Sequence, residues 1–224
     1  MQISFQAALI AAFFLQRWRK TYYMKKITFF IAAFFISTAL LAQQKPVFGL
    51  KAGLNLSKWK VDNQNNDALG TLTGFHLGGI AHFHLSDQIA IQPELQYSTQ
   101  GAEDNSSGND VEFRTGNINI PIMFQYMFDN GFRIEAGPQV GFLVSAEDKL
   151  PNGDELDSKS EYKKTDFSLG VGLNYLTYSG FGIGGRYNFG LSNINDTRSN
   201  DTYNRVLQLS VFYMFDKNHK AKSR

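Results

Sequence analysis

The chain has 224 residues, of which 19% are charged, with a formal net charge of +2 and no cysteine. This length suits one domain, and the lack of cysteine excludes a disulfide-stapled fold and a thiolate metal site. Residues 1–42 hold five basic and no acidic residues, so residues 43–224 carry 17 basic against 20 acidic residues and a net charge of −3. Nothing in this balance indicates nucleic-acid binding.

The N-terminal region has the pattern of an exported protein. From Met24, two lysines precede an apolar stretch and then small residues as far as Ala42. This pattern predicts a signal peptide over 24–42, because the apolar run is too short for a transmembrane helix. We interpret residues 1–23 as an upstream extension from a start codon assigned in error.

Eight segments with apolar residues at every second position follow in chain order. Apolar residues two apart would scatter around a helix but share one face of a strand, so each segment is predicted to be a strand. Each is long enough to cross a bilayer as a tilted strand, which takes about 9–11 residues. The segments are 47–57, 74–85, 89–98, 117–128, 132–144, 166–178, 181–192 and 205–215.

The connections between these segments alternate in length. Short turns at 86–87, 129–131 and 179–180 have the residues of tight hairpins. Between them, the connections are long and polar, and they cover 58–70, 101–113, 146–164 and 193–203. Short turns on one rim and long loops on the other are typical of an outer-membrane barrel. The predicted fold is therefore all-β, an eight-stranded antiparallel up-and-down transmembrane β-barrel over 43–216, followed by a basic periplasmic tail at 217–224.

The polar face of the strands consists mainly of glycine and other small or uncharged polar residues. This composition suits the crowded interior of a narrow barrel better than a surface in bulk water. The apolar face is then expected to meet lipid. Because buried charges are costly unless they are paired, we expect the inward charges to form an interior polar network that leaves no continuous pore. Three basic and three acidic residues fall on this face: Lys51, Arg133, Arg186, Glu94, Glu135 and Asp166.

Aromatic residues gather near both ends of the strands, as in the interfacial girdles of membrane barrels. We expect Trp59 to lie in the girdle beside the long loops. Near the other end, the last strand closes with Tyr213 and Phe215 on its apolar face. These two residues resemble the C-terminal signal by which the barrel-assembly machinery recognises its substrates.

Five motifs along the strands carry a resemblance to a known family: GLKAGLNLS (49–57), NINIPIMFQY (117–126), EAGPQVGFLVSA (135–146), DFSLGVGLNY (166–175) and GIGGRYNFGLSNI (182–194). In their order and spacing the chain resembles the PorT-like outer-membrane β-barrel proteins of the Bacteroidota over about residues 47–215. The resemblance implies an eight-stranded outer-membrane barrel. The secretion role of the member that names the family is not carried over, because a fold does not give a function.

Residues that could support other chemistry are few. His76, His82 and His84 share the inward face of one segment, but without cysteine or a carboxylate on the same strand we interpret them as hydrogen-bonded interior residues. The acidic stretches 61–67 and 152–157 lack the fixed ligand spacing of a calcium loop. No catalytic residue, metal site or cofactor is predicted, and we expect the protein not to be an enzyme.

The sequence thus predicts a monomer in the cell outer membrane, with both termini in the periplasm and four extracellular loops. Its expected role is structural or an interaction role, with outer-membrane lipid, the barrel-assembly machinery and proteins bound by the loops as partners. Two alternatives remain open: an accessory component of a secretion or transport machine, and a narrow channel for small solutes.

Overall fold

The computed structural model of the protein describes residues 45–62, 69–104, 111–196 and 200–216. The extension expected at 1–23, the signal peptide expected at 24–42 and the basic tail at 217–224 lie outside these residues. Within the described ranges no helix is long and apolar enough to span a membrane.

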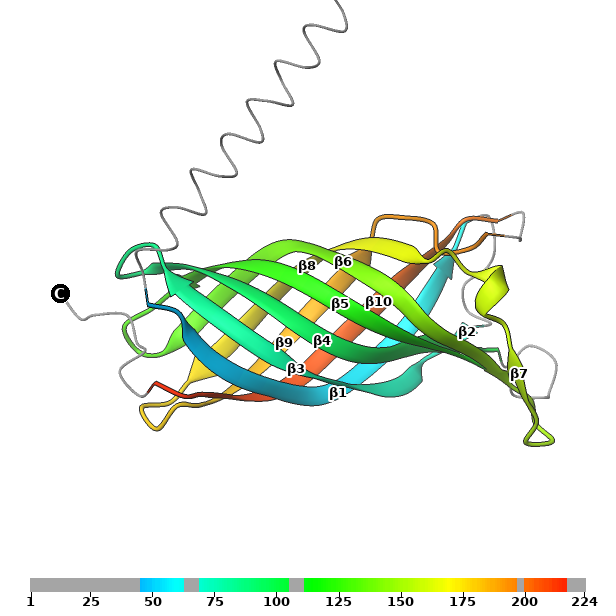
Figure 1. Cartoon of the computed structure of the whole chain (residues 1–224), viewed down its shortest axis with the longest axis horizontal. Helices are drawn as coiled ribbons and strands as arrows, with labels where there is room; N and C mark the ends of the chain where they lie inside the picture. Colours follow the sequence, from blue (N-terminus) through cyan, green and yellow to red (C-terminus); the bar gives the residue numbers. More distant parts are fainter. Residues whose placement is uncertain (1–44, 63–68, 105–110, 197–199, 217–224) are drawn as a thin grey trace, which may run out of the picture. The chain divides into compact units, whose positions relative to one another are not determined.

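Eight long strands lie within the described residues, and each pairs antiparallel with its neighbours to close a barrel (Figure 1). The expected eight-stranded up-and-down barrel is confirmed. The pairing runs β1–β3–β4–β5–β6–β8–β9–β10 and returns to β1. The strands are β1 (Val47–Val61), β3 (Leu72–His84), β4 (Ile89–Asp104), β5 (Val111–Met127), β6 (Phe132–Lys149), β8 (Thr165–Leu176), β9 (Phe181–Gly190) and β10 (Thr202–Met214).

Three hairpin turns join β3 to β4, β5 to β6 and β8 to β9 at one end of the barrel, which we call the short-turn end. Gly131 and Gly180 each have a φ of 92° in two of these turns, a conformation that favours glycine. The opposite end, which we call the long-loop end, carries the short strands β2 (Leu69–Gly70) and β7 (Glu155–Asp157) and one turn of 3-10 helix, η2 (Lys159–Glu161).

The long connections are shorter than the sequence pattern predicted, because the strands continue into them. β4 runs on to Asp104, β5 begins at Val111 and β6 extends to Lys149. These charged strand ends pair in register, with Glu103 opposite Glu112. The wall formed by β4, β5 and β6 is therefore extended at the long-loop end.

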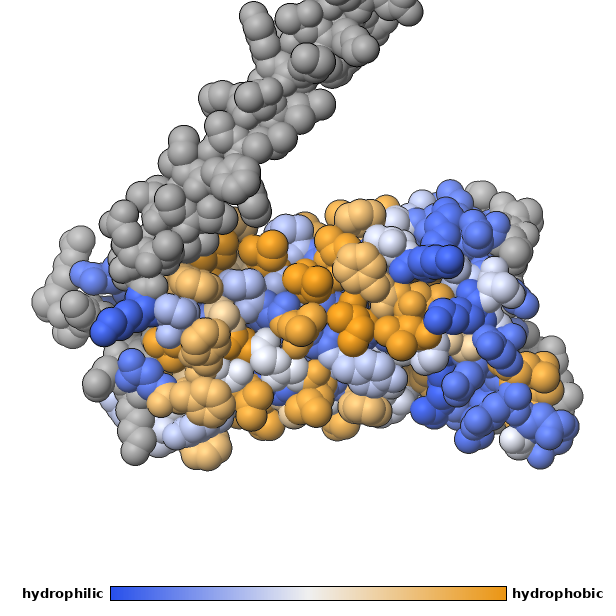
Figure 2. Space-filling model, viewed as in Figure 1, coloured by the Kyte–Doolittle hydropathy of each residue, from blue (hydrophilic) through white to orange (hydrophobic). Residues whose placement is uncertain are grey.

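The outward face of the barrel is apolar along most of its length. Phe132, Ile134 and Phe142, which the sequence pattern placed on the lipid-facing side, are all about half exposed. Arg133 and Glu135, which the pattern placed inside, are buried. Figure 2 shows the resulting apolar band on one face of the barrel, with polar residues gathered at the end that carries β7. The expected division into an apolar outer face and a polar inner face is thus present.

A bulge in β6 changes the phase of this alternation near the long-loop end. Asn117 of β5 pairs with Leu143, whereas Gly116 pairs with Ser145, so Val144 is an extra residue in the ladder. Beyond the bulge Ala146 is buried, although simple alternation from residue 132 would place it outside.

Trp59 is not in the outer girdle where the sequence pattern placed it. It is buried, on the same face of β1 as Lys51 and Asn55. There it packs in a cluster with Tyr162 and Ile194 from the segments at the long-loop end, which accounts for the burial of the indole.

Candidate functional site

The interior is organised around an arginine that crosses it. Arg186 of β9 donates from Nη1 to Glu94 Oε2 at 2.9 Å and from Nη2 to Glu94 Oε1 at 2.6 Å. In the closed strand order, β4 and β9 are separated by three strands in either direction, so the pair joins opposite walls of the barrel. Such a bidentate guanidinium–carboxylate pair is a strong and geometrically specific contact.

Two further charges complete this central ion cluster. Arg186 Nε donates to Glu135 Oε1 at 2.7 Å, and Lys51 Nζ lies 3.5 Å from Glu94 Oε2. All four residues are almost completely buried. Four of the six charges that the sequence assigned to the interior are therefore in mutual contact.

Amide side chains supply the remaining donors to the two carboxylates. Gln92 donates to Glu94 at 2.7 Å, Gln96 also donates to Glu94, and Gln125 donates to Glu135 at 2.9 Å. Because a buried carboxylate is costly unless its lone pairs are filled, these amides are part of what makes the cluster tolerable.

Two glycines of β8 leave space for the side chains of the ion cluster. A side chain on Gly172 would begin 2.9 Å from Glu135 Oε1, and one on Gly170 would begin 3.3 Å from Arg186 Cδ. The glycine-rich inner face of β8 thus leaves space for long charged side chains from other strands.

The remaining two predicted charges are placed differently. Arg133 is buried on the inner face of β6, two residues from Glu135. Asp166 lies six residues before Gly172 on β8, roughly 20 Å along the strand, where its Oδ1 accepts a hydrogen bond of 2.6 Å from Ser192. Asp166 therefore lies apart from Arg186 along the barrel, whereas Arg133 shares the inner face of β6 with Glu135.

The interior histidines lie in amide and hydroxyl surroundings. His76 contacts Asn55 Oδ1 at 2.8 Å through Nδ1 and Ser210 Oγ at 2.9 Å through Nε2. His82 Nδ1 lies 3.0 Å from Gln92 Oε1. Among the described residues, no three His, Asp or Glu side chains are grouped as metal ligands.

Apolar clusters fill the barrel on both sides of the ion cluster, and the sequence reasoning missed them. One lies at the long-loop end, where Trp59 stacks on Phe113 at a centroid distance of 5.4 Å and meets Tyr162 at 5.6 Å. The long-loop cluster contains Trp59, Ala102, Ala146, Tyr162 and Ile194. The short-turn cluster contains Ile80, Leu176, Phe212 and Met214. Their signal in the sequence is a large apolar residue at an inward position near a strand end.

The long-loop end is held together by backbone hydrogen bonds between segments far apart in the chain. Tyr162 forms an isolated antiparallel bridge with Asn195. On either side of it, Lys163 N donates to Ile194 O at 2.8 Å and Asp196 N donates to Glu161 O at 3.0 Å. Residues 161–163, in the connection after β7, are therefore joined to residues 194–196, in the connection before β10.

A family model described as the outer membrane protein beta-barrel domain matches residues 41–196. The chain belongs to this outer-membrane β-barrel family. No curated protein matches the chain. Among solved structures, Neisserial surface protein A (NspA) has 16% identity and a TM-score of 0.51, over 75% of this chain and 97% of that one.

Two other solved outer-membrane proteins align over similar lengths. Ail, the attachment invasion locus protein of Yersinia pestis, has 16% identity and a TM-score of 0.46, over 76% of this chain and 99% of that one. OprG of Pseudomonas aeruginosa has 10% identity and a TM-score of 0.40, over 77% and 97%. At such identities the likeness concerns the fold alone.

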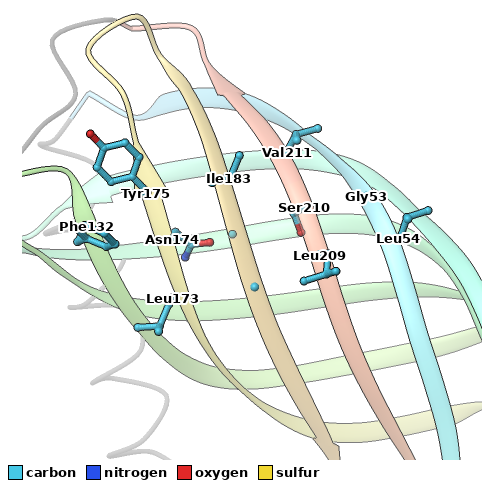
Figure 3. A pocket seen from close by; sticks show the side chains of 12 residues that line it. Gly53, Leu54, Phe132, Leu173, Asn174, Tyr175, Ile183, Leu209, Ser210 and Val211 are labelled. Atoms are coloured by element: carbon cyan, nitrogen blue, oxygen red, sulfur yellow. The ribbon is translucent and has the colours of Figure 1, made fainter. Parts of the chain in front are cut away.

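Because the chain belongs to the outer-membrane β-barrel family, its outward apolar band lies in membrane lipid. On this lipid-facing surface a hollow of about 590 Å³ extends over the neighbouring strands β6, β8, β9, β10 and β1 (Figure 3). Its lining includes Leu54, Leu173, Gly185, Leu209 and Val211.

Proposed function

We propose that this outer-membrane barrel is a structural and interaction protein whose long-loop end faces the cell exterior. In this proposal it is neither an enzyme nor a channel for solutes. The observation that carries the proposal is the Arg186–Glu94 pair across the lumen, with an apolar cluster on either side of it along the barrel.

A solute moving through the barrel would have to separate buried ion pairs and displace packed apolar side chains. Breaking a buried ion pair costs about 3–5 kcal/mol when one charge is left unpaired. The packed interior therefore argues against the channel alternative. We place the proposed contacts at the ends of the barrel instead.

The long-loop end offers the larger contact surface. The β4–β5–β6 wall is extended there, and Glu147 of β6 stands between Arg114 of β5 and Asp157 of β7 in the ladders. These exposed strand ends therefore carry charges of both signs with which a polar partner could pair. The bridged segments around Tyr162 and Asn195 would present this surface in one conformation.

The proposal also includes finer features, which the sequence pattern supports. The protein is a monomer, its termini lie in the periplasm, and the assembly machinery recognises it through Tyr213 and Phe215. Its motifs align it with the PorT-like barrels of the Bacteroidota. An accessory place in a larger machine would be one form of the same interaction role.

Orientation and contact can be tested together in intact cells. Since the chain has no cysteine, a membrane-impermeant maleimide should label Asp154→Cys in intact cells and Tyr178→Cys only after the outer membrane is opened. A photo-crosslinking residue at position 147 should give adducts of discrete mass, and the same residue at position 87 in a short turn should not.

Three results would contradict the proposal. Labelling of Tyr178→Cys in intact cells would reverse the orientation. Adducts from position 87 but not from position 147 would move the contact surface to the periplasm. Stepwise conductance of the purified protein in planar bilayers would restore the channel alternative.

A further inference from the structure

We propose that Lys58 of β1 and Arg205 of β10 form a binding site for the phosphate group of a lipid headgroup. The site lies on the outer wall, at the long-loop end of the seam between these two strands. In the closed strand order this seam stands opposite the seam between β5 and β6. The inference concerns recognition of one charged group at one place, and it does not depend on the proposed interaction role.

Two cations face each other at this place without a counter-charge. Lys58 and Arg205 are directly opposite in the β1–β10 ladder, and each stands on the outward face between buried neighbours. Among the described residues neither side chain has a hydrogen bond or an ion pair, and Arg205 Nε is buried without an acceptor. On the other side of Arg205, Phe189 offers only its ring, with Arg205 Cζ 5.8 Å from the centroid. Because like charges directly opposite destabilise a sheet, an anion between the two cations would remove a cost that the bare barrel carries.

This arrangement is not repeated elsewhere on the described strands. The three other cations on their outward faces each have a carboxylate oxygen within 3.6 Å: Lys60 with Asp62, Arg114 with Glu112, and Lys149 with Glu155. The charge of each of these cations is therefore already matched within the chain. Lys58 and Arg205 together present two positive charges that the described part of the chain does not neutralise.

The two cations line a hollow of about 620 Å³ whose other side is apolar. Leu56 and Leu207 also line it, and they form the next outward pair of the same ladder. From this pair toward the short-turn end the outward residues of β1 and β10 carry no charge. Lys58 and Arg205 are thus the first charged level beyond the apolar band, which is the depth at which lipid headgroups meet the barrel wall.

The chemistry of the pair identifies the ligand as a phosphate carried by a lipid. The guanidinium of Arg205 can donate two parallel hydrogen bonds to phosphate oxygens, and the ammonium of Lys58 adds a point charge beside it. A free phosphate ion would gain nothing from Leu56 and Leu207. A phosphate on a lipid would bring its acyl chains against these leucines and gain the apolar contact as well.

The test is native mass spectrometry of the full barrel released from phosphatidylcholine nanodiscs that contain a minor fraction of phosphatidic acid. Phosphatidic acid carries a phosphate monoester, and its mass distinguishes it from phosphatidylcholine. The unaltered barrel should retain phosphatidic acid in preference to phosphatidylcholine. Lys58→Gln and Arg205→Gln should each lower the ratio of phosphatidic acid-bound to free barrel about tenfold, the effect of losing one charge-assisted hydrogen bond.

Arg114→Gln is the matched control, because it removes an outward cation whose charge Glu112 already matches. It should leave the lipid-bound ratio unchanged. Heat-modifiable gel mobility would show that each variant is folded. A second measurement is the urea midpoint of Lys58→Gln. In phosphatidylcholine vesicles the midpoint should rise, because repulsion with Arg205 is relieved. In vesicles with phosphatidic acid it should fall below that of the unaltered barrel, which the bound lipid stabilises.

The proposal is overturned if the unaltered barrel retains the two lipids equally, or if Arg114→Gln lowers the ratio as much as Lys58→Gln does. Either result would mean that lipid phosphates meet the barrel without a specific site. It is also overturned if Lys58→Gln shifts the urea midpoint in the same direction in both kinds of vesicle. Displacement of phosphatidic acid by added inorganic phosphate would assign the two cations to a free anion and not to a lipid.

Discussion

Arg186 donates hydrogen bonds to both carboxylate oxygens of Glu94. Glu94 comes 92 positions earlier in the chain and stands on the opposite wall of the barrel. Neighbouring strands are joined by backbone ladders, but opposite walls can be joined only through side chains. The Arg186–Glu94 pair is therefore a cross-brace, and through Glu135 it also reaches a third strand.

Loss of this brace should be costly. Arg186→Leu would leave Glu94 and Glu135 without their main counter-charge, and we expect it to lower the free energy of unfolding by about 3–5 kcal/mol. The measurement is the urea midpoint of unfolding in lipid vesicles, followed by gel mobility without boiling. Arg114→Leu is the control: its ion pair with Glu112 is equally short at 2.7 Å but exposed, so it should cost less than about 1 kcal/mol. Equal effects of the two substitutions would mean that the interior pair contributes no more than a surface pair.

The long-loop cluster should hold the segment that follows β7. Trp59→Ala removes the ring between Phe113 and Tyr162, and truncation of a buried tryptophan costs about 3–5 kcal/mol where the site cannot collapse. We expect trypsin to cut faster at Lys159, Lys163 and Lys164 in reconstituted barrels. Leu156→Ala, at an exposed position of the same end, should leave the cleavage rate unchanged. Unaltered cleavage in Trp59→Ala would show that these lysines are held by other contacts.

An aromatic ring covers a glycine on the lipid-facing wall. A Cβ on Gly116 would stand 2.6 Å from Ser145 Oγ and 2.7 Å from the hydroxyl oxygen of Tyr97. Gly116→Ala should displace both side chains and destabilise the barrel, and the same change should cost less in a Tyr97→Ala background, where only the clash with Ser145 remains. A double-mutant cycle on unfolding free energies should give a coupling of about 0.5–3 kcal/mol. Additive effects would mean that the ring and the glycine are independent.

The last strand gives a prediction about assembly. Phe215→Ala should reduce the amount of folded, heat-modifiable barrel in the outer membrane, because the proposed recognition signal is weakened. Phe181→Ala is the matched control, as Phe181 is similarly exposed, at 62% against 58%, and both side chains contact Tyr213. If the two variants assemble equally poorly, the loss reflects aromatic packing around Tyr213 and not a signal.

The strands were predictable because, in a strand with one face toward lipid and the other toward a polar interior, apolar and polar residues alternate. The inward position of Glu94 and Arg186 followed from that pattern alone. Their pairing did not, since alternation says which face a residue occupies and not which strand stands across the lumen. That information appears only when the ring of strands closes.

The errors have a common origin at the long-loop end. Glu103, Glu112 and Lys149 were assigned to loops because charged residues break the apolar alternation. They form ladders because a strand that leaves the lipid can carry charge on its outer face. The bulge at Val144 and the burial of Trp59 belong to the same region, where apolar residues no longer all face outward.

The seam between β1 and β10 has a consequence for the order of events in folding. Its ladder runs from the Gly49–Met214 pair to the Val61–Thr202 pair, so it joins the two ends of the barrel sequence. Without the β10 segment, β1 has no partner on that side, and an unpaired edge is a template for aggregation. Contacts of such sequence separation also form slowly. The formation of this one ladder therefore removes the last two free strand edges of the sheet.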